Sequence, residues 1–485
     1  MNIKAISLNI GKALQVNALF MLISLVISVI YGFDSGFTPL LISFLITLIS
    51  GFFPMIFIKE SRHDTMKEGF ITIVLAWLLS FIFGMMPYVL WGGEFTLMNA
   101  WFESVSGYTT TGSTILTDIE ALPKSLLFWR SSTHFIGGLG VVVFLLLILP
   151  DANPLKLKVS HLELSAIAKE GYKYKSSKTI RVIASVYVGM VIAETLCLWA
   201  AGMSLFDAVN HSLSTIATGG FSTRNNSIMY YDSIAVDMII MLFMLLASIH
   251  FGTIYATIAT RSFKPLTNPV TRYYLYVVAA LSFVSTLALI AGGTYESIGD
   301  AALAGTFQVI SYISTTGFGQ ADNASWPLLA NAMLLFAAFH CGCSGSTTGG
   351  IKADRMYLAL KGISAEFRKR LSPSSVFRVR VGSSIVNEDT IANIYLYIVL
   401  YVIVLLISFC AVLICGVEVG DAFSGTLASI GNVGPGIGTL GTMGNFSTQP
   451  EAAKFIYTID MFMGRLEIFP ILVMIHIIFN RKKGK

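Results

Sequence analysis

Four short stretches of the sequence share a pattern that could hold a cation. Each starts with Asp or Asn followed by Ala, continues through a short apolar segment, and ends at a glycine that follows small or β-branched residues. The four glycines recur about once per hundred residues: Gly112, Gly219, Gly317 and Gly434. Glycine adopts backbone angles that other residues avoid. Four extended loops around one axis could therefore turn their carbonyl oxygens inward, and such a ring replaces the hydration shell of potassium.

A single Thr-Thr-Gly run is typical of an ordinary loop between two helices. Four runs in phase, each after a short helical segment, favour the ring instead. Asp207, Asp300 and Asp421 suit the N-cap position of the short helices. The C-terminal ends of these helices would direct their negative dipole ends toward the centre, which favours a cation there.

The composition indicates that the loops are positioned inside a membrane. The chain has 485 residues, of which 55% are hydrophobic and only 12% charged, and its mean hydropathy is +0.73. Soluble proteins carry about 25% charged residues. This composition excludes a water-soluble enzyme, a disordered chain and a nucleic-acid-binding protein. It predicts an all-α polytopic membrane protein.

Ten segments are long and apolar enough to cross a bilayer, which takes about 20 residues. We interpret the first one as a signal anchor. Crossings with a cytoplasmic N-terminus place most of the 32 Lys and Arg residues on the inner side, as the positive-inside rule requires. Both termini are then expected in the cytoplasm. The ten segments are 13–33, 37–58, 69–92, 131–150, 180–202, 233–260, 273–293, 326–362, 391–416 and 452–478.

The short apolar segments are expected to re-enter the membrane without crossing it, because 10–14 residues are too few to span. They lie near 96–107, 204–215, 299–312 and 420–430. Each repeat then reads as span, re-entrant helix, glycine loop and span, and all four share one orientation around a pseudo-fourfold axis. The predicted units are two N-terminal helices at 1–67, repeat 1 at 68–155, repeat 2 at 156–265, repeat 3 at 266–375 with a broken helix, and repeat 4 at 376–485.

Two features inside the spans could control access. Residues 340–350 are small and flexible and lie in the middle of 326–362, so they should break that helix; the alternative is a site where small residues let helices pack closely. Arg465 lies within the last span, where a charge is costly and usually faces a bundle interior or an aqueous cavity. A positive charge in a cation pathway would raise the barrier. The alternative is a structural salt bridge with Asp460 or Glu467.

Together these motifs resemble the membrane subunit of the bacterial Trk potassium uptake system, within the Trk/Ktr/HKT superfamily. The resemblance covers essentially the whole chain, and the two extra N-terminal spans resemble the Trk branch more than the Ktr branch. The residues that carry it are Thr109–Thr114, Thr215–Ser222, Ser314–Gly319 and Gly431–Gly436, together with Trp129–Gly140 and Cys343–Lys352.

The resemblance implies a potassium filter and a gate. Backbone carbonyls before and at each filter glycine would bind potassium: Thr110, Thr111 and Gly112; Ala217, Thr218 and Gly219; Thr315, Thr316 and Gly317; Asn432, Val433 and Gly434. All four glycines are present, which is similar to the potassium-selective members; in plant relatives a serine at the first glycine goes with sodium transport. The implied gate comprises Gly342, Ser344, Gly345, Ser346, Thr347, Thr348, Gly349, Gly350, Lys352 and Arg465.

The resemblance also implies a setting. It places the chain in the bacterial cytoplasmic membrane as a homodimer, with potassium as substrate and no covalently bound cofactor. A separate cytosolic ring of regulatory subunits would bind NAD, ATP or ADP. The basic inner loops at 151–181 and 360–390 could be its docking surface, or could serve only topology or contact with anionic lipids.

Two other classes of function remain open at this stage. A potassium symporter coupled to sodium or protons would need titratable groups along the pathway, and the candidates are Glu103, Glu194, Asp460 and Glu467. An intramembrane enzyme would need a metal cluster or a nucleophile with a base. Cys341 and Cys343 could bind a metal, but no His/Cys pair at zinc-like spacing accompanies them.

Overall fold

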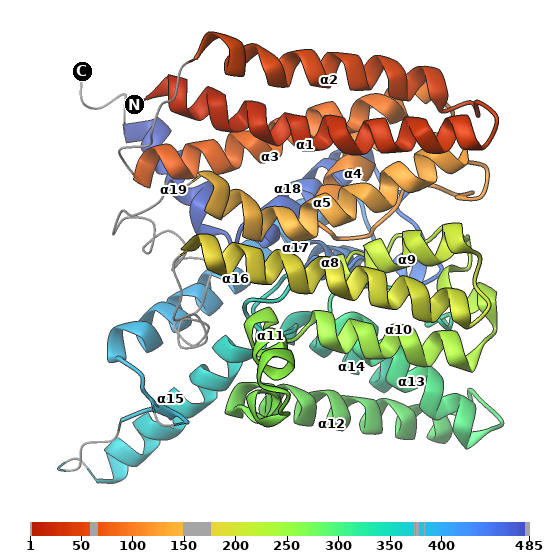
Figure 1. The fold of residues 1–485 in the computed structure, drawn as a ribbon. Helices are drawn as coiled ribbons and strands as arrows, with labels where there is room; N and C mark the ends of the chain where they lie inside the picture. Colours follow the sequence, from red (N-terminus) through yellow and green to blue (C-terminus); the bar gives the residue numbers. More distant parts are fainter. Residues whose placement is uncertain are drawn as a thin grey trace.

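The structure is a computed structural model that describes residues 2–58, 66–148, 176–372, 374, 378–382 and 384–480. Its regular secondary structure within these residues is helical apart from two two-residue strands, β1 (Arg380–Val381) and β2 (Ser384–Ile385). The predicted all-α class is therefore confirmed. The long helices lie side by side along one direction, as a membrane bundle requires (Figure 1).

Six helices are long and apolar enough to cross a bilayer, judged by length and composition over the described residues. The sequence predicted ten crossings, and the other four predicted segments coincide with α5 (Lys124–Ile148) and with three pairs of helices separated by breaks. The six are α1 (Ile3–Ile30), α2 (Phe37–Phe57), α3 (Met66–Trp91), α8 (Ser176–Ala200), α12 (Pro269–Ala291) and α16 (Glu388–Ile414).

Two of the three breaks fall where the sequence predicted continuous helices. The segment 233–260 forms α10 (Ile234–Ala247) and α11 (Phe251–Thr260), which meet at 102°. The segment 452–478 forms α18 (Glu451–Arg465) and α19 (Phe469–Asn480), because Glu467 and Ile468 have positive φ. The third break, between α14 (Leu328–His340) and α15 (Ala353–Leu371), was predicted.

The N-terminal pair of helices packs on the first repeat rather than standing apart. In Figure 1, α1 and α2 form the outermost layer, with α3 and α5 beneath them. Polar side chains of α1 join it to both neighbours: Gln15 Nε2 donates to the Leu48 carbonyl oxygen of α2 at 3.2 Å, and Asn17 Nδ2 donates to Ser80 Oγ of α3 at 3.0 Å. Such hydrogen bonds join helices in a bilayer, where burial of apolar surface does not.

Four short helices lie at the centre of the bundle, one in each predicted repeat. They are α4 (Leu97–Tyr108), α9 (Leu205–Ala217), α13 (Ile298–Ile313) and α17 (Val419–Gly431). The predicted N-cap aspartates lie instead in the first turn. Ser204 and Ser297 take the cap positions of α9 and α13 because their hydroxyl oxygens accept main-chain N–H groups there. Asp207 then accepts from Ser204 Oγ at 2.9 Å.

Aromatic packing holds the first short helix against its neighbours. Phe81, on α3, lies edge-on to Trp101, on α4, with ring centroids 5.9 Å apart. Tyr108, at the end of α4, lies edge-on to Trp129, on α5. The indole of Trp129 donates to the Gly84 carbonyl oxygen at 3.1 Å, so its one polar atom is satisfied inside the core.

The remaining elements lie at the two ends of the bundle. α15, the β1–β2 hairpin and the first turns of α16 extend away from the bundle at one end (Figure 1). The start of α1 and the end of α19 lie at that same end (Figure 1). Short 3₁₀ helices occupy connections: η1 (Ser227–Tyr231), η2 (Lys264–Thr267) and η3 (Gly438–Leu440).

Candidate ion-conduction site

Each short helix ends in the same backbone pattern. One or two residues after the helix end, a residue adopts a left-handed φ of about 50°, and a glycine two positions later has a positive φ again. The residue between them donates its N–H to a carbonyl oxygen in the last turn of the helix. The left-handed residues are Thr110, Thr218, Thr315 and Asn432, and the glycines are Gly112, Gly220, Gly317 and Gly434. The donors and acceptors are Thr111 to Ser106, Gly219 to Ser214, Thr316 to Ser311 and Val433 to Ala428, at 2.8–2.9 Å.

The four loops contact one another in a closed order. A β-carbon on any of the four positive-φ glycines would overlap a carbonyl oxygen of the next loop. The pairs are Gly112 with Gly219, Gly220 with Thr316, Gly317 with Val433, and Gly434 with Thr111. Glycine is thus required both for its backbone angle and for this close approach. The order runs from loop 1 to 2, 3 and 4 and back to 1.

The second loop differs by one residue from the sequence alignment. The motif comparison matched Ala217, Thr218 and Gly219 to the other filter triplets, but the backbone places Thr218, Gly219 and Gly220 at that level. The Gly-Gly pair made the two registers indistinguishable by residue type. Gly219 takes the position of Thr111, and a β-carbon on it would overlap the His134 ring. Ala217 is the last residue of α9.

Hydrogen bonds also join neighbouring loops. Loop 1 meets loop 4 where Ser113 Oγ donates to the Gly434 carbonyl oxygen at 2.9 Å. Loop 2 meets loop 3 where the Ile228 N–H donates to the Gly319 carbonyl oxygen at 3.0 Å. Loop 3 meets loop 4 where the Tyr312 hydroxyl donates to a carbonyl oxygen of the fourth loop. Each junction therefore has its own chemistry, although the backbones repeat.

A small cavity of about 90 Å³ lies where the loops meet, and all four positive-φ glycines line it. Two guanidinium groups also line this cavity, and carboxylates pair with both of them. Arg130 pairs with Glu103 at 2.7 Å, and Arg224 pairs with Asp207 at 3.0 Å. Burial lowers the pKa of the Arg224 guanidinium, but its hydrogen bond to Asp207 raises that pKa above its ordinary value overall. The positive charges at this mouth are thus locally neutralised.

The predicted gating segment lies directly against the inner ends of the loops. Residues 341–352 connect α14 to α15, and the hydroxyl groups among them are buried. Thr347 Oγ1 donates to the Ile216 carbonyl oxygen at 2.9 Å, and the Gly349 N–H donates to Thr315 Oγ1 at 3.2 Å. A β-carbon on Gly349 would lie 2.5 Å from the Gly431 carbonyl oxygen. The segment therefore contacts repeats 2, 3 and 4 at once.

Arg465, at the end of α18, also contacts this segment. Its Nη1 donates to the Thr347 carbonyl oxygen at 2.6 Å, and its Nη2 donates to the Gly137 carbonyl oxygen at 2.9 Å. The two acids proposed as alternative partners are engaged elsewhere. Asp460 accepts from Ser408 Oγ at 2.6 Å, and Glu467 pairs with Lys352 at 2.7 Å and with Arg355.

Asp354 and Arg355 anchor the gating segment to α15, and the motif comparison did not include them. The Asp354 carboxylate accepts from the Ser344 N–H at 2.7 Å and from Ser344 Oγ at 2.8 Å. Arg355 pairs with Glu467 and lies 4.0 Å from the centroid of the Tyr397 ring. Their position four and five residues after the Gly-Gly pair was the available signal. Nothing in the sequence specified which acid each cation would meet.

The acids considered for a coupled transporter fall into two groups. Glu103 and Glu467 are neutralised by arginine or lysine partners. Asp460 and Glu194 are fully buried, and Glu194 lies on α8, which packs against α9. Cys341 and Cys343, the two cysteines considered as possible metal ligands, are buried between α14 and α15. Cys341 Sγ donates to the Ala338 carbonyl oxygen at 2.8 Å.

A groove lies at the projecting end of the molecule. It has a volume of about 1140 Å³ and is lined by α15, the hairpin and the first turns of α16. Along α15, four large apolar side chains at helical spacing are exposed: Leu360, Ile363, Phe367 and Leu371. Arg368, Lys369 and Arg370 occupy the last turn of this helix. The other proposed docking loop, 151–181, falls outside the described residues up to residue 175.

Comparison with known proteins relates this arrangement to one family. The sequence model of the family described as "TrkH: Cation transport protein" matches residues 40–483. The Trk system potassium uptake protein TrkH of Salmonella typhimurium is 33% identical over 419 residues, covering 86% of each chain. TrkH of Vibrio parahaemolyticus is 30% identical over 483 residues, covering 98% of this chain and 99% of that protein.

A solved structure agrees over nearly the whole fold. The crystal structure of the potassium transporter TrkH from Vibrio parahaemolyticus superposes with a TM-score of 0.88 at 29% sequence identity, covering 98% of both chains. The Trk system potassium uptake protein TrkG of Escherichia coli is a further relative, 32% identical over 413 residues and covering 84% of each chain. These relatives are membrane transport proteins rather than enzymes.

Proposed function

The chain belongs to the TrkH family of cation transport proteins, and from that premise we propose that it takes up potassium through a pore lined by backbone carbonyls. The observation that carries the proposal is the closed order of contacts among the four loops, in which each positive-φ glycine meets a carbonyl oxygen of the next loop. Such a ring supplies oxygen ligands around one axis, as a potassium filter does.

The proposed ligands are the carbonyl oxygens of equivalent backbone positions. We assign them to Thr110, Thr111 and Gly112; Thr218, Gly219 and Gly220; Thr315, Thr316 and Gly317; and Asn432, Val433 and Gly434. The second triplet replaces Ala217, Thr218 and Gly219 because the repeated backbone pattern supports the later register. The four short helices direct their C-terminal ends toward this centre, and their negative dipole ends favour a cation.

The proposed gate is the segment from Gly342 to Gly350, with Lys352 and Arg465. Its hydrogen bonds to Ile216 and Thr315, next to the proposed filter residues, support a position across the path of an ion leaving the filter. Arg465 adds a buried positive charge beside the segment. A fixed cation in a low-dielectric pathway opposes the passage of potassium. Opening then requires the segment and the arginine to separate.

The proposed topology keeps the repeats that the sequence predicts. The units are 1–67, 68–155, 156–265, 266–375 and 376–485, with both termini and the projecting end of α15 on the cytoplasmic side. The concentration of Lys and Arg at that end supports this orientation by the positive-inside rule. The proposed location is the bacterial cytoplasmic membrane.

The proposed partners are a second copy of the chain and a cytosolic regulatory ring that binds NAD, ATP or ADP. The exposed apolar side chains of Leu360, Ile363, Phe367 and Leu371 support the dimer, because they form a continuous stripe on α15. The basic last turn of α15 supports an inner docking surface for an acidic partner face.

Ion flux into liposomes tests the proposal. The purified chain is reconstituted alone, and uptake of potassium, rubidium, sodium and lithium is compared along each ion's own gradient. We expect potassium and rubidium to enter faster than sodium and lithium without any other gradient. Flux that appears only with a sodium or proton gradient would contradict the passive pore and support coupled transport.

A further inference from the structure

Arg130 and His134 lie one turn apart on α5 and enclose Phe221, which follows the second filter triplet. The Arg130 guanidinium carbon lies 4.0 Å from the centroid of the Phe221 ring. The His134 ring stacks on the same phenyl ring at 4.1 Å, with an angle of 19° between the planes. We call Arg130, His134 and Phe221 the α5 clamp. All three side chains are buried, so their geometry is set by packing rather than by solvent.

The histidine also contacts the filter backbone itself. A β-carbon on Gly219 would overlap the His134 ring, so the ring packs directly against that residue. The Nδ1 atom of His134 hydrogen-bonds with Ser214 Oγ at 3.0 Å. The carbonyl oxygen of Ser214 accepts the Gly219 N–H at 2.9 Å. One side chain thus holds both the end of α9 and the first extended residue of the second loop.

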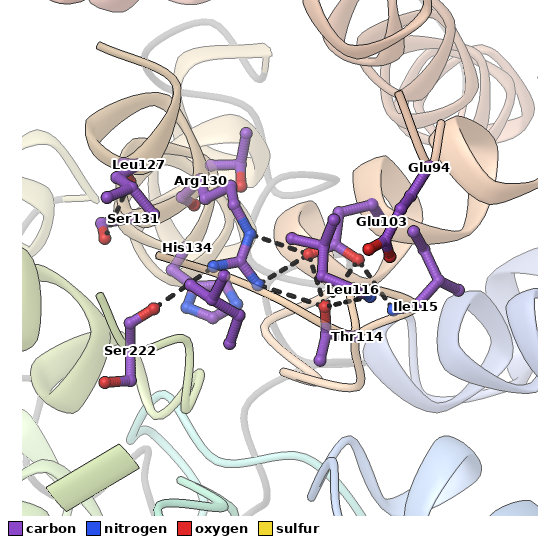
Figure 2. A network of polar contacts seen from close by, with 12 residues as sticks. Glu94, Glu103, Thr114, Ile115, Leu116, Leu127, Arg130, Ser131, His134 and Ser222 are labelled. Carbon is purple, nitrogen blue, oxygen red and sulfur yellow. Dashed lines mark hydrogen bonds and ion pairs between the residues drawn. The ribbon is translucent and has the colours of Figure 1, made fainter. Parts of the chain in front are cut away.

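The arginine links this loop to the first one (Figure 2). Its Nη1 donates to the Ser222 carbonyl oxygen at 3.3 Å, and its Nη2 donates to Thr114 Oγ1 at 3.3 Å. Its Nε donates to Glu103 Oε1 at 2.8 Å, and Glu103 Oε2 accepts the Ile115 N–H at 3.1 Å. The guanidinium therefore bridges the outer ends of loops 1 and 2, and Glu103 on α4 holds it in place.

We propose that the α5 clamp positions the second filter segment against the first and thereby sets the preference for potassium over sodium. The inference rests on the proposed potassium pore and identifies positioning residues for it. A carbonyl ring discriminates between the two ions through its size and the field of its dipoles. Both depend on where Gly219 and Gly220 are held, and the clamp contacts this segment on both sides.

The third loop provides a matched comparison within the same chain. Phe318 follows Gly317 as Phe221 follows Gly220, and it is fully buried. Its aromatic neighbour is His211, at 5.7 Å and tilted by 39°, rather than a stacked ring and a cation. Replacing Phe318 by Leu removes a buried phenyl group beside a filter glycine without touching the clamp.

The experiment measures the rubidium-to-sodium permeability ratio and the total rubidium flux of the full chain in liposomes. Phe221→Leu should lower the ratio roughly five-fold, because it removes both the stacked ring and the cation–π partner. Total rubidium flux should stay within roughly three-fold of the parent, since the carbonyl ligands remain. Phe221→Tyr keeps the ring and should restore the ratio, whereas Phe318→Leu should leave it near the parent value.

If Phe221→Leu does not fold, two other variants test the role of the α5 clamp. Arg130→Lys keeps a cation beside Glu103 but cannot reach Ser222 and Thr114 together. His134→Gln loses the stacked ring. Both should lower the ratio. Unchanged ratios in these variants, or an equal loss in Phe318→Leu, would overturn the clamp. A parent chain that does not distinguish rubidium from sodium would instead overturn the proposed function.

Discussion

Arg465 and Thr347 are 118 positions apart in the sequence, yet Nη1 of the arginine donates to the threonine carbonyl oxygen at 2.6 Å. This hydrogen bond joins the break in the last span to the segment that lies against the inner ends of the filter loops. The donor carries a charge, which makes the bond stronger than one between neutral groups. One contact therefore joins the buried charge of Arg465 to the segment that we propose as the gate.

Replacing Arg465 by Ala should raise basal potassium flux. The change removes the buried charge and releases the gating segment from its hydrogen bond with Thr347. An increase of roughly ten-fold corresponds to about 1.4 kcal/mol off the barrier. Rubidium uptake by the purified chain, without any partner, measures it. Lys361→Ala on the exposed side of α15 serves as the control. Unchanged flux in Arg465→Ala and in a chain with a shortened 342–350 segment would remove the gate assignment.

The register of the second loop predicts a rescue. Gly219→Ala should reduce flux because its β-carbon meets the His134 ring. The double variant with His134→Ala should recover total flux, since the space of the imidazole becomes free. Gly220→Ala should not be rescued in this way, because its β-carbon meets the Thr316 carbonyl oxygen and its φ is +85°. Rescue of Gly220→Ala by the same second change would contradict the register.

Gly112→Ser should relax the preference for potassium over sodium. Gly112 has a φ of +83°, and an added β-carbon would overlap the Gly219 carbonyl oxygen. The first and second loops must then move apart at the level of the ligands. The ratio of rubidium to sodium permeability reports the change. A ratio equal to that of the parent would refute the role of this glycine in selectivity.

Glu467→Gln should destabilise the chain and loosen the gating segment. Glu467 pairs with Lys352 and Arg355, and all three side chains are largely buried. Removing one partner of a buried ion pair costs about 3–5 kcal/mol. Thermal unfolding of the detergent-solubilised chain measures the loss. The control is Glu366→Gln, which breaks an exposed pair with Arg370 and should change stability little.

Phe367→Glu should separate the proposed dimer. Phe367 is 65% exposed on α15 and belongs to an apolar stripe that a second copy would cover. A carboxylate at its centre would meet the same carboxylate on the partner, because a twofold interface places each patch against itself. Size-exclusion chromatography with light scattering gives the mass. A parent chain that is already monomeric would contradict the dimer.

Hydropathy and glycine spacing predicted most of the architecture. The spans, the four short helices and the break near residue 341 follow from segment length and from runs of small residues. The breaks near His250 and Glu467 did not follow, because they depend on partners far along the chain. Phe251 N–H donates to the Gly345 carbonyl oxygen at 3.0 Å, and Glu467 is drawn toward two cations from another repeat.

The sequence predicted the four glycine loops of the proposed filter, but not the register of the second loop. The second loop has two consecutive glycines, Gly219 and Gly220, and either one could match the single glycine of the other loops. Only the backbone angles show that Gly220 is the equivalent residue. His134 is a fully buried residue of α5. Its contact with Gly219 depends on how α5 faces the second loop. No spacing within either segment encodes that orientation.

At the bend between α10 and α11, main-chain groups that would bond within a continuous helix bond instead to the proposed gating segment. The Ser248 carbonyl oxygen accepts the Cys343 N–H at 2.8 Å, and the Phe251 N–H donates to Gly345 at 3.0 Å. Main-chain groups at membrane depth need such partners, because a bare one costs several kcal/mol. If the proposed gate opens by withdrawal of this segment, these main-chain groups must bond to each other or to water. The proposed opening therefore requires a helix of a different repeat to straighten or to become hydrated.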